Sequence, residues 1–157
     1  MKKYGTVAAI FVGPQRRKSM TSLNFVEAIA GRGLKGDRYC TGEGSYNLEK
    51  VGKRQVTLID SKCFEGSPFT WIDSLRNIVT TEVELLWLTT GGGRTFMLGE
   101  ALLRGIEYCD PCDVPSVISG IPGFKKYFFN RACIIAEVLQ GGMIRVGDDI
   151  KHEVKGY

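Results

Sequence analysis

The chain has 157 residues, 43% of them hydrophobic, and a formal net charge of +4 from 21 basic and 17 acidic side chains. This length predicts a single domain, residues 1–157, with enough apolar residues for one core. The charge mildly favours an anionic ligand but does not indicate nucleic-acid binding, and no apolar run approaches the roughly 18 residues of a membrane span.

The N-terminal segment does not have the pattern of a signal peptide. The apolar run Val7–Val12 is short, Gly13-Pro14 ends it, and no small-residue cleavage site follows. The chain has five cysteines, an odd number in a chain large enough to fold without disulfides. We therefore expect reduced thiols and a cytoplasmic location.

Short apolar segments bounded by glycine turns predict a mainly β protein. In chain order, the expected strands are Thr6–Val12, Phe25–Ala30, Gln55–Ile59, Asn77–Thr81, Glu82–Leu85, Thr95–Leu98, Ala101–Tyr108, Arg131–Leu139, Met143–Arg145 and Asp149–Lys151. Short helices are expected over Ser61–Glu65 and Val114–Ser119, and Lys125–Asn130 fits either type of element. Many short strands with few helices favour a closed or partly open β-barrel.

The segment Gly31–Gly36 matches the G-x-G-x-x-G pattern of dinucleotide-binding sites. That pattern needs a following helix, and we expect none after Gly36, so we reject a Rossmann-type site. The glycine-rich loop with Arg32, Lys35 and Arg38 is compatible with an anion-binding nest, but a solvated turn is the commoner structure for such a loop.

Cys109-Asp110-Pro111-Cys112 is the one place where two potential metal ligands or nucleophiles lie within one turn. The pair fits half of a zinc site, a redox pair or one working thiolate, and it also fits two buried cysteines without chemistry. If Asp113 caps the predicted helix, Cys112 precedes its N-terminus, where the dipole favours a thiolate. The spacing alone does not choose among these interpretations.

Arg76 begins a predicted strand, Asn77 follows it, and an arginine in this position is able to reach into a pocket as a donor to phosphate. An arginine at the rim of the fold is the alternative. No P-loop and no G-x-S-x-G motif is present in the sequence, and the only histidine is His152 near the end of the chain.

Six short motifs occur in an order that resembles a stand-alone MOSC domain, named for the C-terminal domain of molybdenum cofactor sulfurase. They are Gly33–Tyr39, Gln55–Ile59, Arg76–Thr80, Phe96–Ala101, Cys109–Cys112 and Ile144–Asp148. The resemblance covers about Tyr4 to Lys151 and implies a β-barrel with a few short helices.

The resemblance also implies a molybdenum cofactor of the molybdopterin type, or sulfur destined for one. The family's working cysteine falls on Cys112, as metal ligand and catalytic group, and a thiolate suits a metal held by other sulfur atoms. The residues that it assigns to the cofactor's phosphate and pocket are Lys35, Arg38, Arg76, Asn77 and Thr80. The chain departs from the pattern at Leu75, where relatives usually carry arginine, and at Glu82, where they often have glycine.

Two functions follow from this resemblance. The first is a molybdenum-dependent oxidoreductase that reduces small N-hydroxylated compounds with electrons from a partner protein. The second is a non-redox module that carries sulfur as a persulfide on Cys112, or delivers cofactor, between a donor and an acceptor protein. Pyridoxal phosphate is not expected within this chain. A scaffold that binds proteins and has lost its ligand remains a third possibility.

Overall fold

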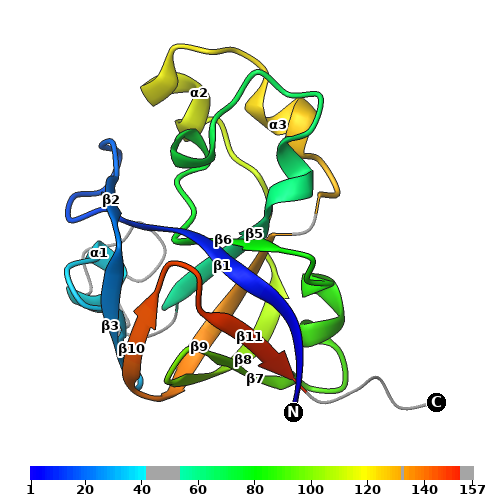
Figure 1. The fold of residues 1–157 in the computed structure, drawn as a ribbon. Coiled ribbons are helices and arrows are strands. Elements are labelled where there is room, and N and C mark those ends of the chain that lie inside the picture. Colours follow the sequence, from blue (N-terminus) through cyan, green and yellow to red (C-terminus); the bar gives the residue numbers. More distant parts are fainter. Residues whose placement is uncertain (42–53, 132, 153–157) are drawn as a thin grey trace.

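The computed structural model describes residues 1–41, 54–131 and 133–152, and the side chains of Lys2 and Lys3 are outside this description. Within these ranges the protein is mainly β, and seven strands close into a barrel (Figure 1). In order round the barrel they are β11 (Asp149–His152), β7 (Thr95–Leu98), β8 (Ala101–Tyr108), β9 (Cys133–Gln140), β5 (Val56–Asp60), β6 (Ile78–Thr81) and β1 (Lys2–Val12). Pairing of β1 with β11 closes the barrel, which confirms the predicted architecture.

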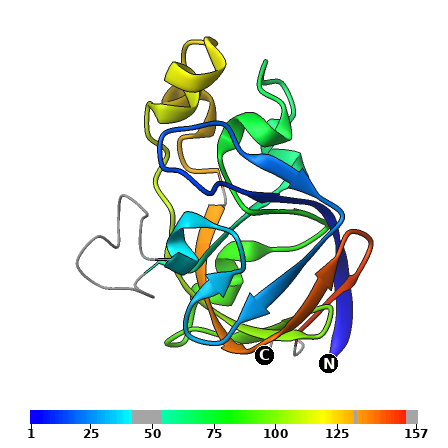
Figure 2. The ribbon, with the colours of Figure 1, turned by 90° about the vertical axis from the view of Figure 1, so that its left-hand side faces the viewer.

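Two smaller sets of strands complete the sheet structure. Strand β2 (Thr21–Leu23) pairs with β1 at one edge. A separate three-stranded sheet has the order β10 (Gly142–Arg145), β3 (Phe25–Ile29) and β4 (Gly33–Leu34). Figure 2 shows this sheet beside the barrel, with α1 (Arg38–Thr41) after β4.

Strands β5 and β6 pair in parallel, whereas the other described pairs are antiparallel. Parallel neighbours need a crossover connection, and here it contains the 3-10 helices η1 (Ser61–Phe64) and η2 (Trp71–Ser74). The connection from β8 to β9 contains α2 (Val114–Ser119) and α3 (Phe124–Phe128). Helices α2 and α3 lie beyond one end of the barrel in Figure 1, at the opposite end from the N-terminus. We call these two connections the cap.

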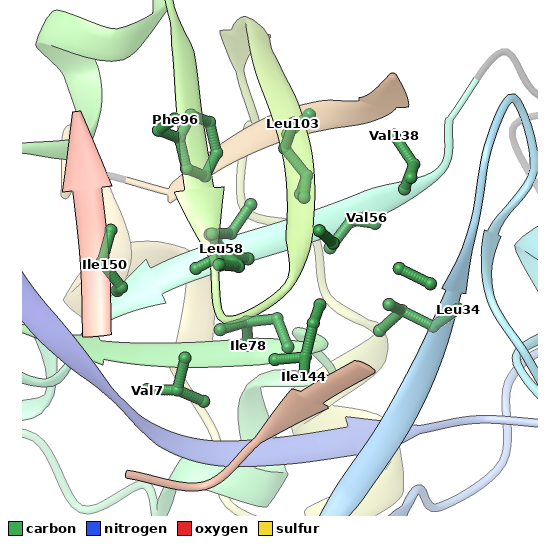
Figure 3. Packing of buried hydrophobic residues seen from close by; sticks show 14 of the residues in the cluster. Val7, Leu34, Val56, Leu58, Ile78, Phe96, Leu103, Val138, Ile144 and Ile150 are labelled. Carbon is green, nitrogen blue, oxygen red and sulfur yellow. The ribbon is translucent and has the colours of Figure 1, made fainter. Parts of the chain in front are cut away.

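The barrel and the cap have separate hydrophobic clusters. Fully buried side chains such as Leu58, Phe96, Leu103 and Ile134 fill the barrel, and Figure 3 shows side chains from facing strands meeting there. A second cluster packs cap residues, including Phe124, against outward-facing side chains of the barrel strands. Every residue of β5 is therefore buried, and this explains a strand that is apolar on both faces.

Two local predictions are wrong. Glu82–Leu85 is not a strand, because Glu82 has a left-handed backbone with φ 60° and the 3-10 helix η3 (Leu85–Thr89) starts three residues later. Val83 and Leu85 are buried and their neighbours Glu82 and Glu84 are exposed, so apolar and polar residues alternate here as they do in a half-buried strand. The segment after Gly36 was expected to be non-helical, yet Arg38–Thr41 forms the single helical turn α1. The barrel topology still excludes a Rossmann-type site.

The other predicted elements lie close to their predicted positions, whereas β2, β4 and η2 have no counterpart among the predicted elements. Strands β7 and β8 and helix α2 have the predicted bounds, and the ambiguous segment after Gly123 is helical. No described helix is long and apolar enough to cross a membrane.

Candidate functional site

A pocket rich in arginine lies between the barrel and the cap, and we call it the outer pocket. It contains about 500 Å³ of space between protein atoms, part of it open to solvent. Its lining residues are Arg17, Arg38, Tyr39, Arg54, Ser74, Leu75, Arg76, Cys112, Val114 and Pro115. Arg38, Arg76 and Cys112, which the family resemblance assigns to one cofactor site, therefore line the same pocket.

Arg76 enters this pocket because the chain reverses at Leu75. Helix η2 has a capping box between Thr70 and Asp73 and ends at Leu75, whose φ of 59° is left-handed. The guanidinium of Arg76 is buried, and its Nη2 donates a hydrogen bond to the carbonyl oxygen of Asp110 at 3.3 Å. Its Nε is also buried and has no hydrogen-bond partner among the described residues.

The charge of Arg76 is favoured by its neighbours. Burial opposes the charged form, but nearby cysteines in their thiolate form, Cys133 most strongly, outweigh burial and raise the pKa of Arg76. A buried guanidinium with an unpartnered N–H group is a donor for an anion in the outer pocket.

Cys112 differs from the other four cysteines of the chain because it alone is not buried. It lies two residues before α2, as the sequence predicts, and Pro115 in the first turn suits the start of a helix. Asp113 occupies the N-cap position but its side chain makes no capping hydrogen bond. Access to Cys112 therefore rests on its partial exposure in the outer pocket.

Helix α1 brings two further groups to the outer pocket. Arg38 is buried, and its guanidinium carbon lies 4.7 Å from the centre of the Tyr39 ring. The guanidinium carbon of Arg54 lies 5.7 Å from the same ring centre. Asp37 pairs with Arg38 at 3.8 Å, so one carboxylate partly offsets the positive charge of this cluster.

Asp37 connects the end of β1 with α1. Its side chain accepts hydrogen bonds from the N–H groups of Gly13 at 2.8 Å and Tyr39 at 3.2 Å, and from Nδ2 of Asn77 at 3.2 Å. Burial raises the pKa of Asp37, although these donors and Arg38 act in the opposite direction. The Gly33–Tyr39 motif thus positions Arg38 through Asp37.

Three residues that the resemblance assigns to the cofactor are not among those lining the outer pocket. Lys35 has 72% of its side-chain surface exposed and pairs with Glu27 at 3.8 Å. Asn77 is buried and bonds to the backbone of Phe11 and to Thr57. The hydroxyl of Thr80 donates to Asp60 at 3.0 Å. The positions of these three residues indicate structural or surface roles.

Arg17, Tyr39, Arg54 and Ser74 were missed by the sequence reasoning. For Arg54 a signal existed: it precedes a strand by two residues, as Arg76 does. Because β5 and β6 are parallel, both arginines lie at the same end of neighbouring strands. The position of Arg54 before its strand therefore predicts a place near Arg76 only when the parallel pairing of β5 and β6 is known. Tyr39 lies in the Gly33–Tyr39 motif, but nothing in the sequence marks its ring as a platform for two arginines.

A second, smaller pocket lies behind Arg76, and we call it the inner pocket. It contains about 190 Å³ between protein atoms, part of it open to solvent, and Arg76 lines both pockets. The other lining residues are Ile59, Cys109, Pro111, Phe124, Phe128, Arg131 and Cys133. Cys109 is thus a buried neighbour of Cys133 and does not share the outer pocket with Cys112.

The outer pocket suits an anionic group beside a soft ligand. Several guanidinium groups and one accessible thiol line it. The described residues contain no group of three or more His, Cys, Asp or Glu side chains placed to hold a metal ion. A metal at Cys112 would therefore depend on ligands from a cofactor. The unpartnered Nε of Arg76 and the thiol of Cys112 fit the phosphate and the metal of such a group.

The fold is shared with solved bacterial proteins. The YuaD protein from Bacillus subtilis superposes with a TM-score of 0.75 over 93% of each chain, at 18% identity. YiiM from Geobacillus stearothermophilus has a TM-score of 0.69 at 17% identity, over 97% of this chain and 76% of that one. YiiM from Escherichia coli has a TM-score of 0.66 at 13% identity, over 99% and 71%. The TM-scores establish a common fold, and at identities this low they establish the fold alone.

A search of curated protein sequences found no match. The family model described as MOSC domain matches residues 73–151, which are half of the chain. The matched residues include Arg76 and Cys112, which the structure brings together in the outer pocket. The chain therefore belongs to the MOSC domain family.

Proposed function

We propose that the protein binds a molybdenum cofactor of the molybdopterin type in the outer pocket and reduces small N-hydroxylated compounds. The observation that carries the proposal is the convergence of Cys112 with Arg38, Arg54 and Arg76 on one pocket. Family membership supports a cofactor of this kind.

The arginines would hold the anionic end of the cofactor. Arg76 supplies an unpartnered buried N–H group, and Arg38 is buried with its guanidinium over Tyr39. Guanidinium groups match phosphate oxygens in pairs, which favours a phosphate over a simple halide. Leu75 contributes an apolar surface where relatives often add another arginine.

Cys112 would be the single protein ligand to molybdenum. It is the accessible cysteine of the chain, and it lines the same pocket as Arg76. A thiolate is a soft ligand that suits a metal already held by sulfur atoms. When bound, the cofactor supplies a metal centre able to pass electrons to a substrate, and a partner protein would supply those electrons.

The alternative is a sulfur carrier with a persulfide on Cys112. The same observations that expose Cys112 and place Arg76 near it favour this function, since a guanidinium also stabilises a persulfide anion. In that case a sulfur donor and an acceptor protein replace the electron donor and the small substrate.

Metal analysis separates the two functions. The protein is purified from a host that makes molybdenum cofactor, beside Cys112→Ser and, as a matched control, Cys40→Ser. Cofactor binding predicts molybdenum in the wild type and in Cys40→Ser, and its loss from Cys112→Ser. A wild type without molybdenum that carries one added sulfur atom on Cys112, found by peptide mass spectrometry, supports the carrier. If the wild type carries neither molybdenum nor an added sulfur atom, both proposed functions are contradicted. A scaffold that binds proteins is then the remaining possibility.

A further inference from the structure

The inner pocket brings two cysteines together from neighbouring strands. Cys109 directly follows β8, and Cys133 begins β9. The register pairs Tyr108 with Ile134, so the next pair outward is Cys109 with Cys133. The N–H of Cys109 donates to the carbonyl oxygen of Cys133 at 2.8 Å, which shows that the pairing continues there.

The backbone spacing of such a pair suits a disulfide. Opposed residues of antiparallel strands have Cα atoms about 4.5–5.5 Å apart, and disulfides span roughly 4.4–6.8 Å. The Cα spacing expected for this register therefore lies within the range that a disulfide spans. In the structure they are free thiols.

The thiols also differ in acidity. A hydrogen bond from Cys133, helped by the charge of Arg76 and opposed by burial, lowers the pKa of Cys109 to about 6. Burial and the same hydrogen bond raise the pKa of Cys133. These opposite shifts favour the proton on Cys133 and the thiolate on Cys109. The two form a nucleophile with a thiol beside it.

We propose that Cys109 and Cys133 form a reversible cross-strand disulfide, and that this dithiol controls anion binding in the outer pocket through Arg76. The proposal goes beyond the proposed function, because it holds for any anion that the outer pocket takes. It gives a role to two of the four buried cysteines, none of which cofactor binding at Cys112 uses.

The oxidant is a small peroxide, for which hydrogen peroxide is the simplest case. The Cys109 thiolate attacks one peroxide oxygen, the O–O bond breaks, and water leaves after proton uptake. The resulting sulfenic acid is attacked by Cys133, which forms the S–S bond and releases a second water. In total, two thiols and one hydrogen peroxide give one disulfide and two water molecules. A thiol reductant reverses the reaction.

Arg76 connects this pair to the outer pocket because it lines both pockets. In the reduced protein the Cys109 thiolate attracts the guanidinium of Arg76 and offsets part of its positive charge. The disulfide carries no charge, so Arg76 becomes fully available to an anion in the outer pocket. Oxidation should therefore tighten anion binding.

The first experiment follows the bond. The reduced full-length protein is treated with limiting hydrogen peroxide, and free thiols are alkylated before peptide mass spectrometry. We expect a Cys109–Cys133 disulfide in the wild type and in the control Cys40→Ala, and a trapped sulfenic acid on Cys109 in Cys133→Ala. A bond between Cys109 and Cys112 instead, or persistence of both buried thiols, overturns the proposal. If Cys133→Ala does not fold, the presence or absence of the Cys109–Cys133 disulfide in the peroxide-treated wild type decides the test.

The second experiment measures the coupling with inorganic pyrophosphate as the probe. Its dissociation constant is measured by calorimetry for the reduced and the oxidised wild type. We expect about tenfold tighter binding after oxidation, the order of magnitude for removing one nearby charge. Equal dissociation constants, or weaker binding after oxidation, contradict control through Arg76. Neither readout depends on bound molybdenum, so failure here is distinguishable from failure of the proposed function.

Discussion

Nη2 of Arg76 donates a hydrogen bond to the backbone carbonyl oxygen of Asp110 at 3.3 Å, so the start of β6 is tied to the Cys-Asp-Pro-Cys segment. This contact holds the guanidinium between the outer pocket with Cys112 and the inner pocket with Cys109. One side chain thus positions two cysteine-bearing regions relative to the barrel.

Arg76→Ala should reduce the molybdenum content of the purified protein at least tenfold, because the pocket loses its buried donor. Loss of the bond to Asp110 should lower the free energy of unfolding by about 1–3 kcal/mol. Molybdenum is measured by elemental analysis, and stability by urea denaturation. The matched control is Arg94→Ala, since Arg94 stacks on Trp87 outside both pockets. Equal molybdenum in both variants would contradict the role of Arg76.

Leu75→Arg should strengthen anion binding. Leu75 lines the outer pocket, and an arginine there adds a guanidinium to the lining, as the family resemblance implies for this position. We expect several-fold tighter binding of inorganic pyrophosphate, with a steeper decrease as salt rises. Calorimetry at two salt concentrations checks this, with Leu75→Gln as the control for polarity without charge. If both variants bind alike, the added charge does not reach the anion.

Cys112 should be the first cysteine to react with limiting iodoacetamide at neutral pH. The reason is accessibility, because the other four cysteines are buried and iodoacetamide is bulkier than a peroxide. Peptide mass spectrometry of the alkylated protein gives the order of labelling. Faster labelling of Cys40, Cys63 or Cys109 would show that Cys112 is shielded in solution.

Asp37→Asn should lower the free energy of unfolding by about 1–3 kcal/mol, because both carboxyl oxygens of Asp37 accept hydrogen bonds from N–H groups. A protonated carboxyl oxygen can still accept such a bond, whereas the amide nitrogen of asparagine cannot. The loss should depend on pH. Burial raises the pKa of Asp37 above 3.8, so the folded state binds the proton more tightly than the unfolded state. The difference in free energy of unfolding between the wild type and Asp37→Asn is then largest below pH 3.8, and it decreases as pH rises through the raised pKa.

Urea denaturation of both proteins over a series of pH values measures this trend. Asp73→Asn is the control, because Asp73 is also hydrogen-bonded but lies in an exposed capping box. An advantage of the wild type that grows with pH would show that the carboxylate of Asp37 is stabilised as the anion.

Glu82→Gly should stabilise the protein by up to about 1 kcal/mol. Glu82 is exposed and has φ 60°, a conformation that glycine adopts without strain. Glu82→Ala removes the same carboxylate but keeps the strain, and it should give no such gain. Thermal unfolding of the three proteins provides the comparison. A gain in the alanine variant equal to that in the glycine variant would assign the effect to charge.

Most of the fold is readable from local patterns. Thr95–Leu98, Ala101–Tyr108 and Val114–Ser119 have the predicted bounds because their periodicity and their flanking turn residues agree. The strand predicted over Glu82–Leu85 is wrong because four alternating residues are compatible with a 3-10 turn as well as with a strand. The helical turn Arg38–Thr41 was missed because contacts distant in sequence, such as Gly13 with Asp37, hold it.

The sequence by itself determined the mainly β class, the position of Cys112 before a helix and the family, because local periodicity and ordered motifs are properties of the chain. Only the tertiary structure decided which arginines face Cys112. It separated Arg38 and Arg76, in the outer pocket, from Lys35, Asn77 and Thr80. It also added Arg54 and paired Cys109 with Cys133. These relationships depend on strand register and on the parallel pairing of β5 with β6, which join residues far apart in sequence and leave no local signal.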